Sequence, residues 1–193
     1  MASITQIPGY VVGTWDIDAS HSTVGFSVRH MMVSKVRGRF SKFEGTIRTG
    51  DNFVDSSVEA SIDMGSIDTN NEQRDGHIRS ADFFDAEKYP YITFKLTGIE
   101  PVDDENFRVK GELTVKEITK PITLDATVEG RMPDPFGARE RVGISARGQL
   151  NRMEFGLNWD GLAGAVPFAS HTIKLEVDAE IVVKAEELAE SKK

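Results

Sequence analysis

The polar residue best placed for chemistry is His30, which ends a run of alternating apolar residues formed by Val24, Phe26 and Val28. A neutral imidazole in this position can hydrogen-bond a ligand headgroup while its ring packs against apolar neighbours. It can equally be a core histidine whose nitrogens are satisfied by the backbone or by a carboxylate. The sequence leaves both hypotheses open.

Basic side chains form the second candidate group. Arg74, Arg79 and Lys120 would suit an anionic headgroup, because guanidinium groups bind phosphate through two parallel hydrogen bonds. The simpler interpretation of Arg74 is an ion pair with Asp75 that pins its own segment. Both interpretations remain open at this level.

Motifs of covalent and metal catalysis do not occur in the sequence. It contains no G-x-S-x-G, no P-loop, no G-x-G-x-x-G and no H-E-x-x-H. The histidines His21, His30, His77 and His171 lack the spacing of metal ligands. The absence of cysteine excludes disulfides, thiolate metal sites and cysteine nucleophiles. The sequence therefore predicts no catalytic residue, no metal and no cofactor, and it favours a binding protein over an enzyme.

Alternation of apolar and polar residues dominates the chain and predicts the elements that must position these side chains. Such runs span residues 23–30, 54–64, 92–97, 107–115, 122–128, 142–150 and 172–181. Alternation with one wet face is typical of antiparallel sheet. Between residues 35 and 47 the period slips once, which predicts a bulge near Ser41 and Lys42.

Residues 66–89 break this pattern and predict one helix or two short ones between strands. Asp68 or Thr69 can cap the helix, and Glu72 is placed to complete a capping box. About eight strands joined by short turns, with one helical insertion, predict an all-β fold. The expected architecture is a closed up-and-down antiparallel barrel, because closure removes the edges of the sheet.

The size of the inward-facing residues decides whether such a barrel is hollow. Several mid-strand positions on the apolar face are small, namely Gly45, Ala60, Gly111, Ala126, Ala146, Gly148 and Ala179. They would leave a lengthwise cavity for an apolar ligand. Glycines can also let strands coil while large side chains fill the middle. The sequence leaves a hollow and a filled barrel open.

Length, charge and composition limit the classes of protein to which the chain can belong. The 193 residues suit one domain, and a net charge of −8, from 23 basic and 31 acidic residues, argues against binding nucleic acid or docking to anionic membranes. No segment approaches the roughly 20 apolar residues of a membrane span. Residues 1–10 show no basic region, apolar stretch or cleavage site of a secretory signal, a pattern that predicts a cytoplasmic protein.

The ordered motifs of the chain resemble the YceI-like family of polyisoprenoid-binding proteins. The matching blocks are Trp15-x-Ile17-Asp18-x-x-His21-Ser22, Val24-x-Phe26-x-Val28-x-His30-Met31, Arg74-Asp75-x-His77-Ile78-Arg79, Asp82-Phe83-Phe84-Asp85, Tyr89-Pro90-x-Ile92-Thr93-Phe94 and Arg152-x-x-Phe155-Gly156-Leu157-x-Trp159. The resemblance covers the chain from about Trp15 to Val183. It departs from the family pattern at residues 161–172, which read GLAGAVPFASHT.

The resemblance implies an extended lipocalin-like barrel that holds a long apolar lipid, such as a polyisoprenoid, an isoprenoid quinone or a fatty amide. It also implies a homodimer and relatives that are often periplasmic. We expect an extension over residues 1–14, the barrel over 15–184 and a tail over 185–193. Two alternatives remain: an enzyme acting on such a lipid with His30 as acid and base, and a filled-barrel scaffold. The predicted ligand contacts are Phe26, Val28, His30, Phe40, Phe43, Phe83, Phe84, Phe94, Phe155, Trp159, Arg74 and Arg79.

Overall fold

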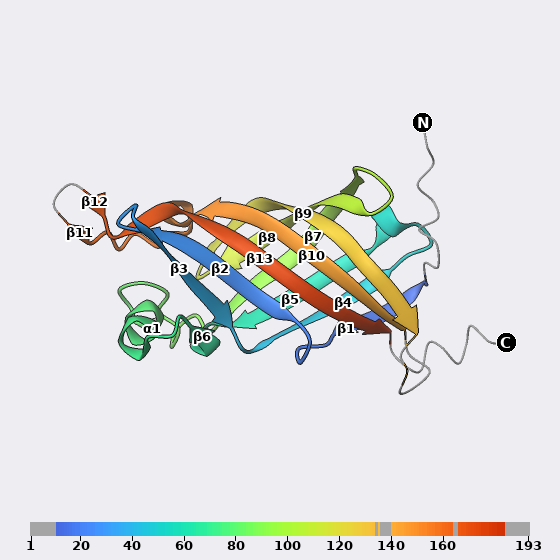
Figure 1. Cartoon of the computed structure of the whole chain (residues 1–193), viewed down its shortest axis with the longest axis horizontal. Coiled ribbons are helices and arrows are strands. Elements are labelled where there is room, and N and C mark those ends of the chain that lie inside the picture. Colours follow the sequence, from blue (N-terminus) through green and yellow to red (C-terminus); the bar gives the residue numbers. More distant parts are fainter. Residues whose placement is uncertain (1–10, 134, 136–139, 164–165, 184–193) are drawn as a thin grey trace.

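Eight antiparallel strands close into an elongated barrel, as the sequence predicts (Figure 1). The computed structural model describes residues 11–133, 135, 140–163 and 166–183. Around the wall the strands are β1 (Gly13–Ile17), β4 (Phe43–Thr49), β5 (Ser57–Asp63), β7 (Tyr91–Pro101), β8 (Asn106–Val115), β9 (Ile118–Pro133), β10 (Glu140–Asn151) and β13 (Ala169–Val183). The barrel closes where β13 pairs with β1, with Trp15 opposite Val183 and Ile17 opposite Ile181.

The long strand β13 pairs with two strands along one of its edges. Its C-terminal end pairs with β1, and its N-terminal part pairs with β2 (Thr23–His30). Strand β3 (Ser34–Phe40) pairs with β2, and the two-residue β6 (Ile67–Asp68) pairs with β3. These three strands extend the wall at the end of the barrel where the helix lies (Figure 1).

The predicted bulge near Ser41 and Lys42 is wrong. The chain turns a corner there, because β3 pairs with β2 and β6 whereas β4 pairs with β1 and β5. Hydrogen bonds to residues 63–66 hold the corner: Ser66 Oγ accepts from the backbone N–H of Lys42 at 3.0 Å and donates to the carbonyl of Asp63 at 2.6 Å, and the N–H of Ser41 donates to the carbonyl of Ser66 at 3.2 Å. A slip in period therefore marked a change of partner strand and not an extra residue in one ladder.

The helical segment is a single short helix, α1 (Glu72–Arg79). The predicted caps are wrong: Asn71 is the N-cap, and its side chain accepts a hydrogen bond from the N–H of Arg74 at 2.9 Å. Buried Asp75 instead receives the backbone N–H of Thr69 at 3.0 Å, which ties the helix to the preceding chain. The remaining short elements are η1 (Phe53–Asp55), η2 (Met64–Ser66), η3 (Arg152–Phe155), β11 (Leu162–Ala163) and β12 (Val166–Pro167).

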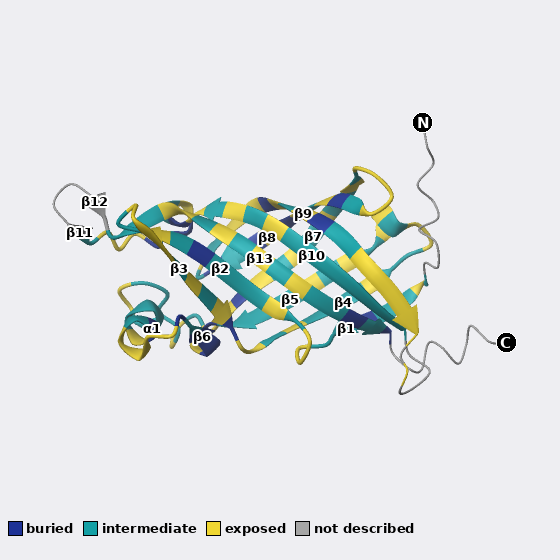
Figure 2. Cartoon of the chain, viewed as in Figure 1, coloured by how far each residue is buried: buried dark blue, intermediate teal, exposed yellow. Residues whose placement is uncertain are grey.

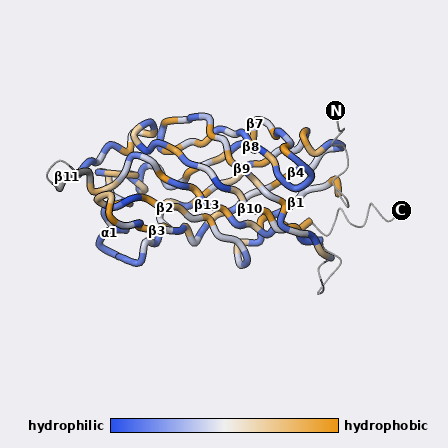
Figure 3. Tube along the Cα trace, turned by 45° about the horizontal axis from the view of Figure 1, so that its top comes forward, coloured by the Kyte–Doolittle hydropathy of each residue, from blue (hydrophilic) through white to orange (hydrophobic). Residues whose placement is uncertain are grey.

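Two separate clusters of buried hydrophobic residues lie toward opposite ends of the barrel, and Figure 2 shows where the strands are buried. The core at the helix end contains Phe40, Met64, Ile67, Ile92, Leu113, Val115, Ile122, Phe155 and Leu157. The core at the other end contains Trp15, Ile181 and Val183. Figure 3 shows hydrophobic and hydrophilic residues alternating along the strands that connect them. Within the described chain, no helix is long and apolar enough to cross a membrane.

Candidate functional site

An internal cavity of about 1030 Å³ occupies the barrel between the two cores. Its wall is formed by the inward-facing residues of every barrel strand, together with β2, β3 and α1, and most of these residues are aliphatic or aromatic. A water-sized group takes about 30 Å³ in a liquid, so the cavity has room for roughly 30 groups the size of a methylene.

The side chains of the mid-barrel wall confirm that the interior is hollow. Inward residues in the middle of the strands stay partly accessible, among them Val24, Phe26, Phe94, Leu96, Ile144, Ala146, Val177 and Ala179. In a packed interior, apolar residues at such positions would be fully buried. The filled barrel that the sequence left open is therefore not what the structure shows.

Glycines on the wall let aromatic rings lie flat against the sheet. The ring of Phe26 covers its cross-strand partner Gly38, and the ring of Phe94 covers Gly111, so that a Cβ at either glycine would collide with the ring. A Cβ at Gly148 would lie 2.5 Å from Leu124 Cδ2 and 3.0 Å from a backbone oxygen. These glycines thus pack the wall, whereas Ala146 and Ala179 face the open cavity.

Four rings gather where the cavity meets the helix end. Ring centroids are 4.8 Å apart for His77 and Trp159, 6.3 Å for Trp159 and Phe168, and 6.1 Å for Phe168 and His30. His30 Nδ1 lies 2.8 Å from the carbonyl oxygen of Phe168, so Nδ1 donates and Nε2 of a neutral ring is left as an acceptor. His30 is therefore held by the backbone and also lines the cavity.

Arg152 holds the chain that carries these rings. Its guanidinium is fully buried and donates to the carbonyls of Leu157, Trp159, Ala169 and Ser170. It also forms an ion pair with Asp160 at 2.9 Å. The hydrogen bonds satisfy the buried charge, and they fix the segment after η3 across the end of the barrel.

The predicted ligand contacts converge on the cavity with one exception. Arg79 does not line it; its guanidinium pairs with Glu72 at 2.8 Å on the outer side of α1. Arg74 does line the cavity, and it donates to the Thr69 hydroxyl and carbonyl oxygens, each at 2.7 Å. The predicted residues found on the cavity wall are Phe26, Val28, His30, Phe40, Phe43, Phe83, Phe84, Phe94, Phe155, Trp159 and Arg74.

Sequence reasoning missed several wall residues. The rings of Phe107 and Phe53 are in tilted contact with centroids 4.5 Å apart, and both line the cavity far from α1. The alternation of residues 107–115 already put Phe107 on the inner face and was the available signal. Phe53 follows a turn and forms part of η1, so strand periodicity gave no signal for it.

A network of ion pairs and hydrogen bonds lies where β1 meets the C-terminal part of β13. Asp18 Oδ1 accepts from Ser20 Oγ at 2.5 Å, and Asp18 Oδ2 accepts from Arg141 at 2.9 Å and lies 3.0 Å from Nδ1 of His21. Hydrogen bonds from Ser20, His21 and Arg141 lower the pKa of Asp18 far below its ordinary range. The same contact with Asp18 raises the pKa of His21.

This network contains three groups that could ligate a metal, Asp18, His21 and Glu180. Arg141 already pairs with both carboxylates, so a guanidinium occupies the position where a cation would be held. The donor set therefore fits an ion-pair network that ties the barrel closure together, and it does not fit a metal site.

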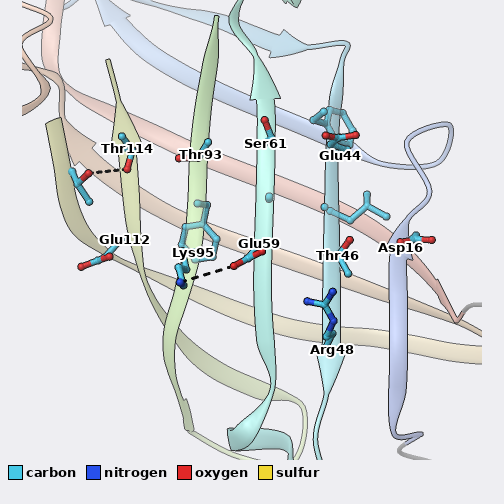
Figure 4. Close-up of a pocket in the computed structure, with 16 residues that line it drawn as sticks. Asp16, Glu44, Thr46, Arg48, Glu59, Ser61, Thr93, Lys95, Glu112 and Thr114 are labelled. Carbon is cyan, nitrogen blue, oxygen red and sulfur yellow. Dashed lines mark hydrogen bonds and ion pairs between the residues drawn. The ribbon is translucent and has the colours of Figure 1, made fainter. Parts of the chain in front are cut away.

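The outer face of β1, β4, β5, β7 and β8 is slightly hollowed and carries alternating charges and hydroxyls (Figure 4). Glu59 and Lys95 are 4.0 Å apart, and the hydroxyls of Thr114 and Thr119 are 2.8 Å apart. Charges of both signs are interspersed here, which is typical of a solvated sheet surface.

The closed sheet and the apolar interior define a hollow, lipocalin-like β-barrel. The chain belongs to the YceI-like domain family, because the model of that family matches residues 15–182. A Vibrio cholerae protein of the UPF0312 group is 36% identical over 178 residues, which cover 89% of this chain and 92% of that protein.

Solved structures repeat the fold. The Campylobacter jejuni YceI protein is 28% identical and superposes with a TM-score of 0.69, covering 92% of this chain and 99% of that one. A polyisoprenoid-binding domain from Saccharophagus degradans superposes with a TM-score of 0.64 at 17% identity, covering 90% of this chain and all of that one (100%). At 17% identity the second likeness supports the fold alone.

Proposed function

We propose that this protein binds a long apolar lipid of the isoprenoid class inside its barrel. The observation that carries the proposal is the apolar cavity of about 1030 Å³ between two separate cores. Each methylene moved from water into such a cavity gains about 0.8 kcal/mol. A chain of about 20 carbons therefore supplies enough free energy to offset the cost of association and still bind tightly.

Polarity along the cavity favours one orientation for the ligand. At the helix end the wall carries the cationic or neutral groups Arg74, His77 and His30. At the other end it carries the carboxylates of Asp104, Glu105 and Glu129, and the arginine at this end, Arg131, is paired with Glu140. A quinone or phosphate headgroup is better accommodated at the helix end, because the opposite carboxylates would repel an electron-rich group.

A domain of the same fold, from Saccharophagus degradans, is named as polyisoprenoid-binding. The ligand class rests on the cavity, whose apolar wall runs along the elongated barrel (Figure 1) and suits a chain more than a compact molecule. Catalysis gains no support from the site. The partner of His30 is a carbonyl, whereas a general base is normally oriented by a carboxylate or positioned against a nucleophile. We therefore propose binding, for transport, storage or sensing, without a chemical step.

Native mass spectrometry of the purified full chain tests the proposal. We expect an adduct of one lipid per chain, which organic extraction then identifies, or an adduct formed after adding geranylgeraniol or a ubiquinone. A mass without adduct after addition of a prenol, a quinone and a fatty amide would overturn the proposal and favour a scaffold. An adduct of a compact polar molecule would overturn the isoprenoid class.

A further inference from the structure

We infer that the hairpin of β2 and β3 docks the protein on an anionic phospholipid membrane with the helix end of the barrel facing the bilayer. The turn of this hairpin, residues 31–33, lies at the same end as α1 and β11–β12 (Figure 1). Because the net charge of −8 argues against such docking, the inference depends on how charge and apolar surface are distributed locally.

The tip of the hairpin is apolar and exposed. Met32 is 61% exposed and Val33 is 83% exposed, the highest value among the large hydrophobic residues that the structure describes. Met31 and Met32 both have a positive φ, 47° and 59°. Turns with this backbone favour Asn and Gly, so two methionines are costly for folding alone. A strained turn that presents large apolar side chains to solvent is typical of a contact surface.

Basic residues surround this tip. Residues 19–43 contain five Lys or Arg and no Asp or Glu, in a chain with an excess of acidic residues. Arg29 lies directly opposite Lys35 across the hairpin, one pair behind the turn, and Arg37 follows on the same outer face. Like charges directly opposite each other on a sheet are destabilising. Within the described chain, none of these three forms an ion pair, whereas Arg39 pairs with Asp68.

The apolar tip and the basic face suit the two layers of an anionic membrane. Apolar side chains insert at the boundary of headgroups and acyl chains, while lysine and arginine remain at the phosphates. Trp159 is 38% exposed and lies at the same end of the barrel as the tip. It contacts the ring of Phe168, and the carbonyl of Phe168 accepts a hydrogen bond from the N–H of Met31. Tryptophan is enriched at the membrane interface, which adds a third side chain of the expected type.

The position of the hairpin relates docking to the cavity. His30, which forms the base of the tip, lines the cavity together with Trp159 and Phe168. Docking by this end would place the ring-lined end of the cavity against the bilayer, where a lipid is exchanged without crossing water. The role of docking in lipid exchange rests on the proposed function, but membrane docking itself does not.

Vesicle sedimentation of the full chain tests docking directly. We expect binding to vesicles of phosphatidylcholine mixed with phosphatidylglycerol, weaker binding at high salt, and much less to phosphatidylcholine alone. The double change Lys35→Glu with Arg37→Glu should lower the partition coefficient at least about tenfold. The matched control, Arg48→Glu with Lys95→Glu, makes the same change of net charge on the opposite outer face (Figure 4) and should bind like the unchanged protein.

The apolar tip has its own test, Met32→Ser with Val33→Ser. This variant should keep its fold by circular dichroism and its lipid adduct by native mass spectrometry, yet lose membrane binding. The inference is overturned if the unchanged protein does not bind vesicles that contain phosphatidylglycerol. It is also overturned if the tip variant binds them as well as the unchanged protein, or if the control variant loses as much binding as the Lys35→Glu, Arg37→Glu variant. Retention on a single-stranded oligonucleotide without vesicle binding would overturn it in favour of a nucleic-acid surface.

The two tryptophans report the orientation. Trp15 is 3% exposed in the core at the far end, whereas Trp159 lies at the docking end. Brominated phospholipids should quench the fluorescence of a Trp15→Phe variant, in which Trp159 remains, and leave a Trp159→Phe variant unquenched. The reverse pattern would show docking by the other end and overturn the inference, while the lipid adduct would still test the proposed function separately.

Discussion

Replacing Ala146 by phenylalanine should block ligand binding while leaving the barrel folded. Ala146 faces the cavity from the middle of β10, where its cross-strand partners are Ala126 and Val177. The new ring adds about six carbon atoms to the cavity and excludes a similar number from the ligand. At about 0.8 kcal/mol per methylene, ligand burial falls by about 5 kcal/mol. Such a loss weakens binding on the order of 10³-fold.

The assay is titration with retinol, an isoprenoid alcohol whose fluorescence rises in an apolar environment. The matched control is Gln149→Phe, which places the same ring on the exposed outer face of the same strand. We expect the control to bind like the unchanged protein and the Ala146→Phe variant to keep its melting temperature, because the ring enters existing space. A folded Ala146→Phe variant with nearly unchanged retinol affinity would refute the hollow-barrel reasoning.

Three further outcomes are expected. Arg152→Ala should destabilise the protein by about 3–5 kcal/mol in urea titration, since it removes a buried charge that holds several carbonyls, and Arg152→Lys should recover little of this. Gly38→Ala should cost about 1–3 kcal/mol, because the new Cβ collides with the ring of Phe26; an unchanged unfolding midpoint would count against the wall packing. Asp18 has a lowered pKa, so its contribution to stability is present above its ordinary value of 3.8 and is lost as pH falls. His21 has a raised pKa, so its contribution is present below 6.5 and is lost as pH rises. Asp18→Asn should therefore lower the melting temperature at every pH above 3.8, with the largest loss where His21 is also protonated, and the loss should shrink as pH falls below 3.8. An equal loss at all pH values would contradict the assignment.

Strand periodicity was enough to predict the barrel, because one face of every long strand is apolar. The strand expected at 54–64 begins only at Ser57, since Phe53–Asp55 form a 3₁₀ turn. The short strands β1 and β6 were not predicted, because two to five residues carry too little alternation and their pairing depends on distant partners. The corner at Ser41 and Lys42 was misread for the same reason: it depends on Ser66, 24 positions along the chain, whose Oγ accepts a hydrogen bond from the N–H of Lys42.

The site was predictable where it is apolar and less so where it is polar. Phe26 and Phe94 lie on the wall because alternation fixes which face a strand residue occupies. Arg79 is not on the cavity wall, because on a helix of two turns one residue can face outward while its neighbours face inward, and Glu72 lies within reach of its guanidinium. The partner of His30, a carbonyl 138 positions away, has no signature in sequence.

The partly accessible wall of the barrel has a thermodynamic consequence. Packed domains show a heat-capacity increase of about 12–15 cal/mol/K per residue on unfolding, because apolar surface becomes hydrated. Here a share of the apolar wall is already in contact with the cavity in the folded state. The empty protein should therefore unfold with a smaller heat-capacity change and a flatter dependence of stability on temperature than a packed domain of this length. A cavity-filling ligand should restore both toward ordinary values.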